Sequence, residues 1–74
     1  MFDVRFYFNG KKFKIRLVNL GKEEVARFGG ILRENGIIEN QISDITVDDG
    51  KTVCRGVVTL DKHGTLVEIG RSLM

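Results

Sequence analysis

The sequence predicts a small α+β protein, an antiparallel sheet of four to five strands in the chain order β-β-α-β-β-β with one helix packed on one face. Two observations lead to this prediction. Nine glycines and no prolines divide the 74 residues into short segments, and most segments have the apolar–polar alternation of strands. Only one segment has helical spacing. No repeat, linker or low-complexity tract interrupts the pattern, so we expect a single domain over residues 1–74.

Composition narrows the class of protein further. The chain is 42% apolar and 30% charged, which is typical of a globular rather than a disordered protein. No apolar run reaches the ~18 residues that would cross a bilayer. The first residues alternate apolar and charged types and lack the apolar core of a secretory signal, and a single cysteine cannot form an internal disulfide. We therefore expect a cytoplasmic protein without a membrane segment.

The first hairpin has a register that its own side chains define. Asn9-Gly10 is a strong signal for a two-residue turn, because a type I′ turn needs positive φ at both central residues. With that turn, one face carries the apolar pairs Phe2–Leu17, Val4–Ile15 and Phe6–Phe13 and also the pair Phe8–Lys11. The other face carries the pairs Asp3–Arg16, Arg5–Lys14 and Tyr7–Lys12. A slip of one residue would mix the two sets, so the pattern predicts this register.

Residues 22–35 have the spacing of a helix. Its apolar stripe consists of Val25, Phe28, Leu32 and either Gly29 or Ile31. Glutamates at positions 23 and 24 suit the positive end of the helix dipole. Gly36 followed by Ile37 predicts a Schellman stop in which Ile37 contacts Leu32. The internal pair Gly29-Gly30 costs ~1 kcal/mol per residue relative to alanine, and we expect it where the helix packs closely on a sheet or a partner.

The second half of the sequence contains three further strand-like runs. Residues 42–48 and 52–60 flank the Asp49-Gly50 turn signal as a second hairpin, whose loop has two residues, or three with a bulge. The run 53–60 is apolar on both faces, as is typical of a central strand. A two-residue turn at His63-Gly64 leads into the strand 65–69 and would place Leu60 opposite Val67 and Val58 opposite Ile69. Residues 71–74 are expected to form a loose tail or an arm that docks on a partner.

Residues that could carry chemistry are dispersed. His63, the one histidine, lies in a predicted turn, and Cys54 lies mid-strand among valines, where a thiol behaves as a small buried hydrophobe. The acidic run around Asp48-Asp49-Gly50 lacks the spacing of an EF-hand and is explained by turn chemistry. No nucleotide-binding or nucleophile motif occurs. We therefore predict a protein that is not an enzyme and that has no cofactor and no metal site.

The clearest candidate for a binding surface is the basic side of the first hairpin. Residues 1–22 hold six basic residues and one acidic residue, a net charge of +5, whereas residues 23–74 hold six and nine, a net charge of −3. The candidate binding residues are Arg5, Tyr7, Lys11, Lys12, Lys14 and Arg16. An aromatic ring among cations on a sheet suits single-stranded nucleic acid, and a cationic face equally suits an acidic protein surface. The alternative without a function is a solvated outer face that discourages edge aggregation.

A net charge of only +2 over the whole chain favours a protein partner, because dedicated nucleic-acid-binding domains carry a larger basic excess. We therefore expect a small regulatory protein that acts through protein–protein contacts, such as the inhibitors and adaptors of phages and mobile elements. Direct nucleic-acid binding through the basic side of the hairpin is the alternative. A chain this short buries little core, and without prolines its strand edges are open to pairing, so we also expect a homodimer.

Overall fold

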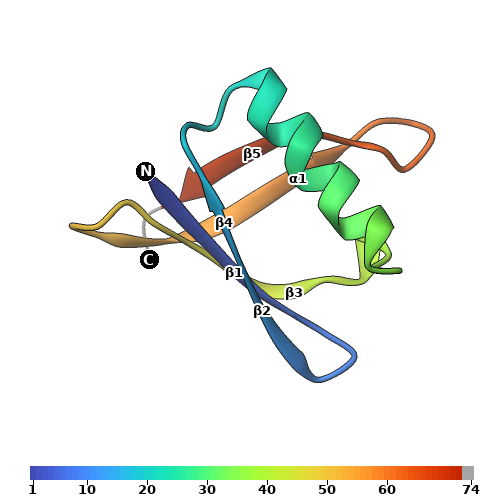
Figure 1. Ribbon diagram of the computed structural model, residues 1–74, viewed down its shortest axis with the longest axis horizontal. Coiled ribbons are helices and arrows are strands. Elements are labelled where there is room, and N and C mark those ends of the chain that lie inside the picture. Colours follow the sequence, from blue (N-terminus) through green and yellow to red (C-terminus); the bar gives the residue numbers. More distant parts are fainter. Residues whose placement is uncertain (73–74) are drawn as a thin grey trace.

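The computed structural model describes residues 1–72, which form one antiparallel sheet and one α-helix (Figure 1). The elements are β1 (Phe2–Phe8), β2 (Lys11–Leu17), α1 (Lys22–Glu34), the short 3-10 helix η1 (Glu39–Gln41), β3 (Ser43–Asp48), β4 (Val53–Leu60) and β5 (Leu66–Ser72). All five strands join one sheet in the order β2-β1-β3-β4-β5. The predicted α+β fold, with its β-β-α-β-β-β order, is confirmed.

The first hairpin has the register that its side-chain pattern predicts. Every predicted pair is present, from Phe2 opposite Leu17 to Phe8 opposite Lys11. Asn9 and Gly10 have φ values of 52° and 75°, as a type I′ turn requires. Val4 and Phe6 are fully buried, and Phe6 stacks on Phe13 and meets Phe28 of α1 edge to face. The apolar side of this hairpin is therefore the side that faces the helix.

The buried side of α1 is the apolar stripe that the sequence predicts. Its buried residues are Val25, Phe28, Gly29 and Leu32, so Gly29 rather than Ile31 completes the stripe. Gly36 has a φ of 68°, and the N–H of Ile37 donates to the carbonyl of Leu32 at 2.9 Å, which is the predicted Schellman stop. The helix ends at Glu34 and Asn35 is its C-cap, one residue earlier than the predicted range.

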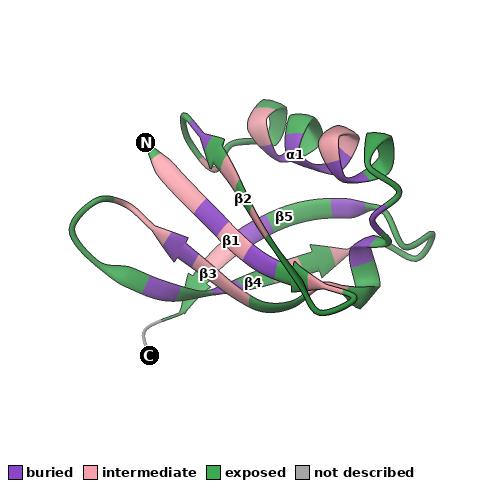
Figure 2. Cartoon of the chain, turned by 60° about the horizontal axis from the view of Figure 1, so that its bottom comes forward, coloured by how far each residue is buried: buried purple, intermediate pink, exposed green. Residues whose placement is uncertain are grey.

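The sheet curls around the helix. α1 packs against β5 and β2, the two outermost strands, and the hairpin β1–β2 crosses β4 and β5 at a steep angle (Figure 1). The core lies in the space between α1 and the concave side of the sheet, and buried residues alternate with more exposed ones along the strands (Figure 2). Because α1 is the one α-helix of residues 1–72, the convex side of the sheet has no covering layer in this part of the chain.

The hairpin between β3 and β4 has a two-residue loop, one of the two lengths that the sequence leaves open. The N–H of Asp49 donates to the carbonyl of Thr52 at 3.3 Å, so Gly50 and Lys51 form the loop, and the register continues with Asp48 opposite Val53. The Asp48 carboxylate accepts the N–H of Gly50, and the Asp49 carboxylate accepts the N–H groups of Lys51 and Thr52, which stabilises this turn.

In the last hairpin the prediction is half right. Val58 lies opposite Ile69 as predicted, but Leu60 lies opposite Leu66 instead of Val67, with a register shift between the two pairs. The Asp61 carboxylate accepts the N–H groups of His63 and Thr65 at 2.8 and 2.9 Å, and this stabilises a loop longer than the two residues expected. The strand that follows continues through Ser72, so the predicted loose tail is wrong for Arg71 and Ser72. Leu73 and Met74 lie outside the described residues.

β3 and β4 pair over only part of their length. Their register consists of three pairs, ending with Thr46 opposite Arg55. Beyond Thr46, β3 has an irregularity: one residue of β1 separates Arg5 and Tyr7, whereas two residues of β3 separate their partners. Asp44, inside this bulge, has a φ of 53°. A bulge bends its strand, so β3 remains with β1 and leaves β4.

Candidate binding surface

The side of the sheet away from α1 carries the side chains that sequence analysis selected. We name it the open face. Residues directly opposite each other on antiparallel strands lie on the same face, so the registers define it row by row. One row reads Lys14, Arg5, Thr46, Arg55, Ser72 across all five strands. Neighbouring rows read Arg16, Asp3, Asp48, Val53 and Lys12, Tyr7, Ser43.

Five of the six predicted binding residues lie together on the open face. They are Arg5, Tyr7, Lys12, Lys14 and Arg16. Tyr7 is 38% exposed, so its ring is accessible as predicted. Lys11 does not join them: it lies opposite Phe8 on the helix-facing side, and its Nζ is 5.9 Å from the centre of the Phe13 ring.

Two aspartates reduce the positive charge of the open face. Arg16 donates to Asp3 at 2.9 Å, and the Arg5 guanidinium lies 3.2 Å from Asp48 and 3.7 Å from Asp3. The hydrogen bond from Arg16 is the main reason why the pKa of Asp3 lies below its ordinary value, so this carboxylate is ionised at neutral pH. Asp48 comes from β3, and a reading of the hairpin alone therefore could not include it.

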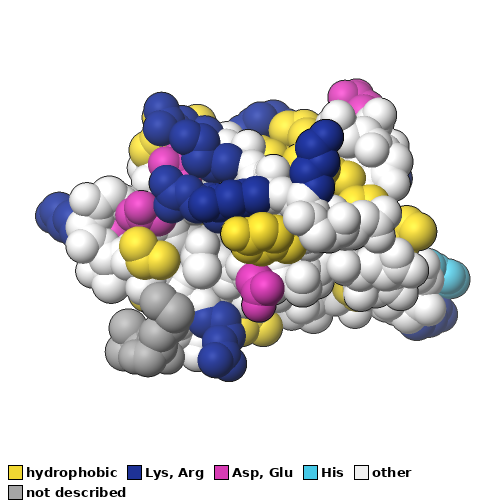
Figure 3. Space-filling view, turned by 90° about the horizontal axis from the view of Figure 1, so that it is seen from below, with side chains coloured by type: hydrophobic (Ala, Val, Ile, Leu, Met, Phe, Trp, Pro, Cys, Tyr) yellow, Lys and Arg dark blue, Asp and Glu magenta, His cyan; other side chains and the backbone are white. Residues whose placement is uncertain are grey.

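Basic side chains gather over part of this side of the molecule, with acidic and hydrophobic side chains among them (Figure 3). The lysines at positions 12 and 14 are exposed and make no ion pair with any residue in the range 1–72. The open face is therefore mixed, with accessible lysines beside arginines that are already paired.

Sequence analysis missed the contribution of β4. Arg55 lies in the central row of the open face, and Val53 and Val57 flank it at 42% and 47% exposure. The run 53–60 does form an inner strand of the sheet, but its second apolar face is uncovered instead of buried. The available signal was the alternation Val53-Arg55-Val57, which places an arginine between two valines on one side of a strand.

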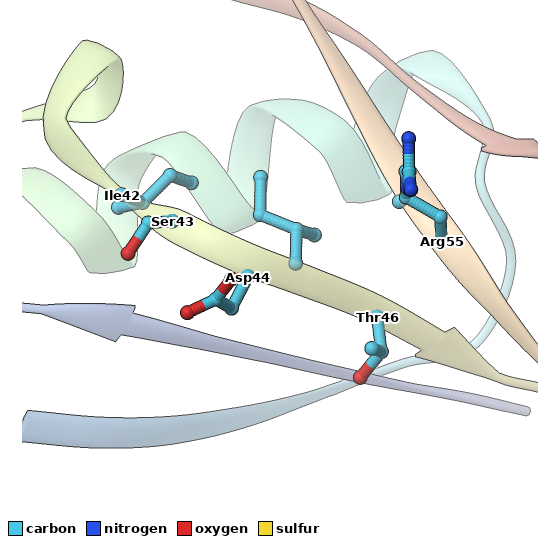
Figure 4. A pocket seen from close by; sticks show the side chains of 7 residues that line it. Ile42, Ser43, Asp44, Thr46 and Arg55 are labelled. Carbon is cyan, nitrogen blue, oxygen red and sulfur yellow. The ribbon is translucent and has the colours of Figure 1, made fainter.

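A cavity of about 420 Å³ lies where β3 and β4 separate. Residues 42–46 line one wall, and Arg55 and Gly56 line the other. Ser43, Asp44 and Thr46 extend from β3, while Arg55 extends from β4 (Figure 4). An added Cβ at Gly56 would lie 2.3 Å from the Cγ2 of Ile45, so glycine is the residue that lets the Ile45 side chain lie over β4 at this point.

Cys54 and His63, the other residues that were considered for chemistry, differ in their exposure to solvent. Cys54 is buried, and His63 is exposed in the loop between β4 and β5. Within residues 1–72, no group of three or more metal-ligating side chains converges. In that same range no helix is long and apolar enough to cross a membrane.

Comparisons of the chain with protein-family models, with curated proteins and with solved structures gave no significant match. The surface itself is therefore the basis for any functional conclusion.

Proposed function

We propose that this protein is a non-enzymatic binding protein that docks a protein partner on the open face. The observation that carries the proposal is the mixed character of that face, where exposed valines and a tyrosine lie among cations. Protein–protein interfaces combine apolar and aromatic contacts with arginine in this way. We further propose that the protein works in the cytoplasm as a homodimer and regulates a larger partner, as small inhibitors and adaptors do.

Charge compensation favours a protein partner over nucleic acid. Arg5 and Arg16 already pair with Asp3 and Asp48, so much of the positive field that would attract phosphates is cancelled on the protein itself. A protein surface with an acidic rim and an apolar centre matches the remaining pattern of Lys12, Lys14 and the β4 valines.

The experiment is affinity purification from the native host with nuclease present, using the wild-type chain and two charge-reversal variants. Lys12→Glu with Lys14→Glu alters the open face, whereas Lys22→Glu with Lys62→Glu changes the net charge equally at exposed positions elsewhere. We expect a specific protein to be retained by the wild type and the control and lost by the open-face variant. Equal retention by all three proteins would exclude the open face as the docking surface.

Single-stranded nucleic acid is the second candidate, favoured by the accessible Tyr7 ring opposite Lys12. This function predicts that affinity for a labelled oligonucleotide falls steeply with salt. Removal of two phosphate contacts by Lys12→Ala and Lys14→Ala should reduce the slope of log affinity against log salt by about 1.4. Fluorescence anisotropy without any binding at ~50 mM salt would eliminate this candidate.

A further inference from the structure

We propose that the cavity between β3 and β4 is a peptide site, in which an extended segment of the protein partner pairs with β4 and places a carboxylate on Arg55. This inference rests on the proposed function and deepens it, because it states which part of the molecule receives a strand and what that strand carries. Three features of β4 support this site: unpaired main-chain groups, an accessible arginine and an adjacent cavity.

The first feature is the main chain of β4. The N–H of Asp61 donates to the carbonyl of Thr65, on the β5 side. Along a strand, the N–H and C=O groups of successive residues point alternately to one neighbouring strand and to the other. Val58 and Leu60 therefore direct their N–H and C=O groups away from β5, toward the side of β3. Pairing with β3 ends at Arg55, and the loop and side-chain hydrogen bonds of residues 1–72 do not involve these two residues. This stretch of β4 is an edge within the sheet.

The outer edges of the sheet are less suited to strand addition. β2 carries Lys11, Lys12, Lys14 and Arg16, and lysines on an edge strand oppose pairing. β5 packs against α1, and the N–H of Leu66 at its start already donates to the buried Glu39 carboxylate at 2.7 Å. Strand addition is therefore most favourable at the inner edge of β4.

The second feature is Arg55, which determines the charge of the ligand. Its side chain is exposed, lines the cavity and makes no ion pair with any residue from 1 to 72. Asp44 lies on the opposite wall, so the site carries one charge of each sign. A strand that offers an acidic side chain to Arg55 and a basic or neutral one to Asp44 matches both walls, whereas a polyanion would meet the Asp44 carboxylate.

The third feature is the cavity itself, which adjoins the open face because Thr46 and Arg55 belong to both. A partner docked on the valines of β4 can therefore extend a segment into the cavity without leaving the surface. In such a complex the main-chain pairing supplies affinity and the Arg55 contact supplies selectivity.

The test begins with a random twelve-residue peptide library displayed on phage and selected on the full chain. A selected peptide is then titrated into the ¹⁵N-labelled protein. We expect an acidic residue within an otherwise β-branched sequence, and the largest shifts at the amide signals of Val58 and Leu60. Arg55→Ala should weaken binding about tenfold or more, as loss of a charged hydrogen bond does, whereas Lys51→Ala, in the distant β3–β4 turn, should leave it unchanged.

Two modified peptides distinguish strand pairing with β4 from simple electrostatic attraction. N-methylation of the peptide main chain should abolish binding, since it removes the donors that pair with β4. Replacement of the peptide acid by lysine should weaken binding to the wild type and restore it to Arg55→Glu, which a merely structural role of Arg55 would not produce.

Shifts confined to Tyr7, Lys12 and Lys14 would overturn the peptide site and leave the docking surface intact. Absence of any selected peptide would also overturn the peptide site. The proposed function fails separately, if charge reversal at Lys12 and Lys14 leaves partner capture unchanged.

Discussion

Two carboxylates, those of Glu39 and Glu24, connect the helix to the strands. Glu39 is 7% exposed and accepts hydrogen bonds from Arg33 at 2.8 Å and from the N–H of Leu66 at 2.7 Å. Glu24 accepts the N–H of Val18 at 2.7 Å and pairs with Arg27, which in turn donates to the carbonyl of Arg16. Each carboxylate thus joins one end of α1 to a neighbouring strand or its flanking residue. These hydrogen bonds determine where α1 lies along the sheet, which its apolar stripe alone would not do.

We expect Glu39→Ala to lower the free energy of unfolding by about 2–3 kcal/mol, since it leaves the Leu66 N–H without an acceptor. Urea denaturation measures this change. Glu34→Ala, an exposed change in the last turn of α1, is the control and should stay within about 0.5 kcal/mol of wild type. Equal stability of the Glu39 and Glu34 variants would mean that the buried carboxylate contributes nothing to the fold.

The free energy of unfolding should also depend on pH in the acidic range. Hydrogen bonds from Arg27 and then from Val18 lower the pKa of Glu24 to about 2, and main-chain N–H groups of Thr52 and Lys51 lower the pKa of Asp49 to about 2. Because both folded pKa values lie below the ordinary values of 4.5 and 3.8, these groups stabilise the fold fully above those values. Their contribution is lost as the pH falls toward about 2.

Thermal unfolding between pH ~5 and pH ~2.5 should therefore show a falling midpoint for the wild type. Glu24→Gln should reduce that fall, while Glu23→Gln, an exposed neighbour, should retain it. An unchanged acid dependence in Glu24→Gln would exclude the hydrogen bonds of Glu24 as its source.

At the scale of elements, Gly29 and Gly30 of α1 and Gly56 of β4 differ in how much space a side chain would have at each position. In α1, Gly29 is buried, and a Cβ there would contact Arg33 and Glu39 at 3.4 and 3.5 Å, whereas a Cβ at Gly30 would meet nothing within 4 Å. Close packing, which the sequence suggested as the reason for both helix glycines, is therefore required at neither, because the distances at Gly29 are ordinary van der Waals contacts with side chains. In β4, Gly56 is necessary because Ile45 occupies the space of a side chain.

Alanine substitutions at Gly30 and Gly56 should therefore have opposite effects on the stability of the protein. Gly30→Ala should stabilise the protein by about 1 kcal/mol through helix propensity alone. Gly56→Ala should destabilise it by about 1–3 kcal/mol, because its methyl group would force Ile45 out of place. Chemical denaturation of both variants tests the pair, and a stabilising Gly56→Ala would contradict the packing assigned to the point where β3 leaves β4.

At the scale of the whole molecule, the charge asymmetry of the sequence is partly cancelled by the fold. The basic hairpin meets Asp48 of β3, and Arg71 of β5 pairs with Asp49 at 3.1 Å and lies over the Phe2 ring. The open face has no covering layer in residues 1–72, and it includes the exposed side chains of Val53 and Val57. An exposed apolar area rimmed by charge is typical of an interaction surface.

The oligomeric state also belongs to the scale of the whole molecule, and we expect a homodimer. Light scattering should give a mass twice the 8.4 kDa of the chain if two copies associate, and Val57→Lys should return the protein to one chain if the open face is the contact. Ile38→Lys, at an equally exposed apolar residue between α1 and η1 and outside the sheet, is the matched control. A monomer mass for the wild type at high concentration would exclude the dimer.

Much of the fold could be predicted because its signals are local. Turn residues and alternation within fifteen residues of each other define the first hairpin, and the apolar stripe and Gly36 define the helix and its end. The loop after Leu60 was mispredicted because the Asp61 side chain, rather than the His63-Gly64 pair, determines its length.

The sequence by itself determined the elements, the register of the first hairpin and the grouping of Arg5, Tyr7, Lys12, Lys14 and Arg16 on one face. Only the tertiary structure decided which strands are neighbours. That arrangement brings Asp48 to Arg5, adds Arg55 to the same face and separates β3 from β4. The physical reason is that alternation is a short-range property of a strand, whereas contacts across a sheet depend on how distant segments pair and bend.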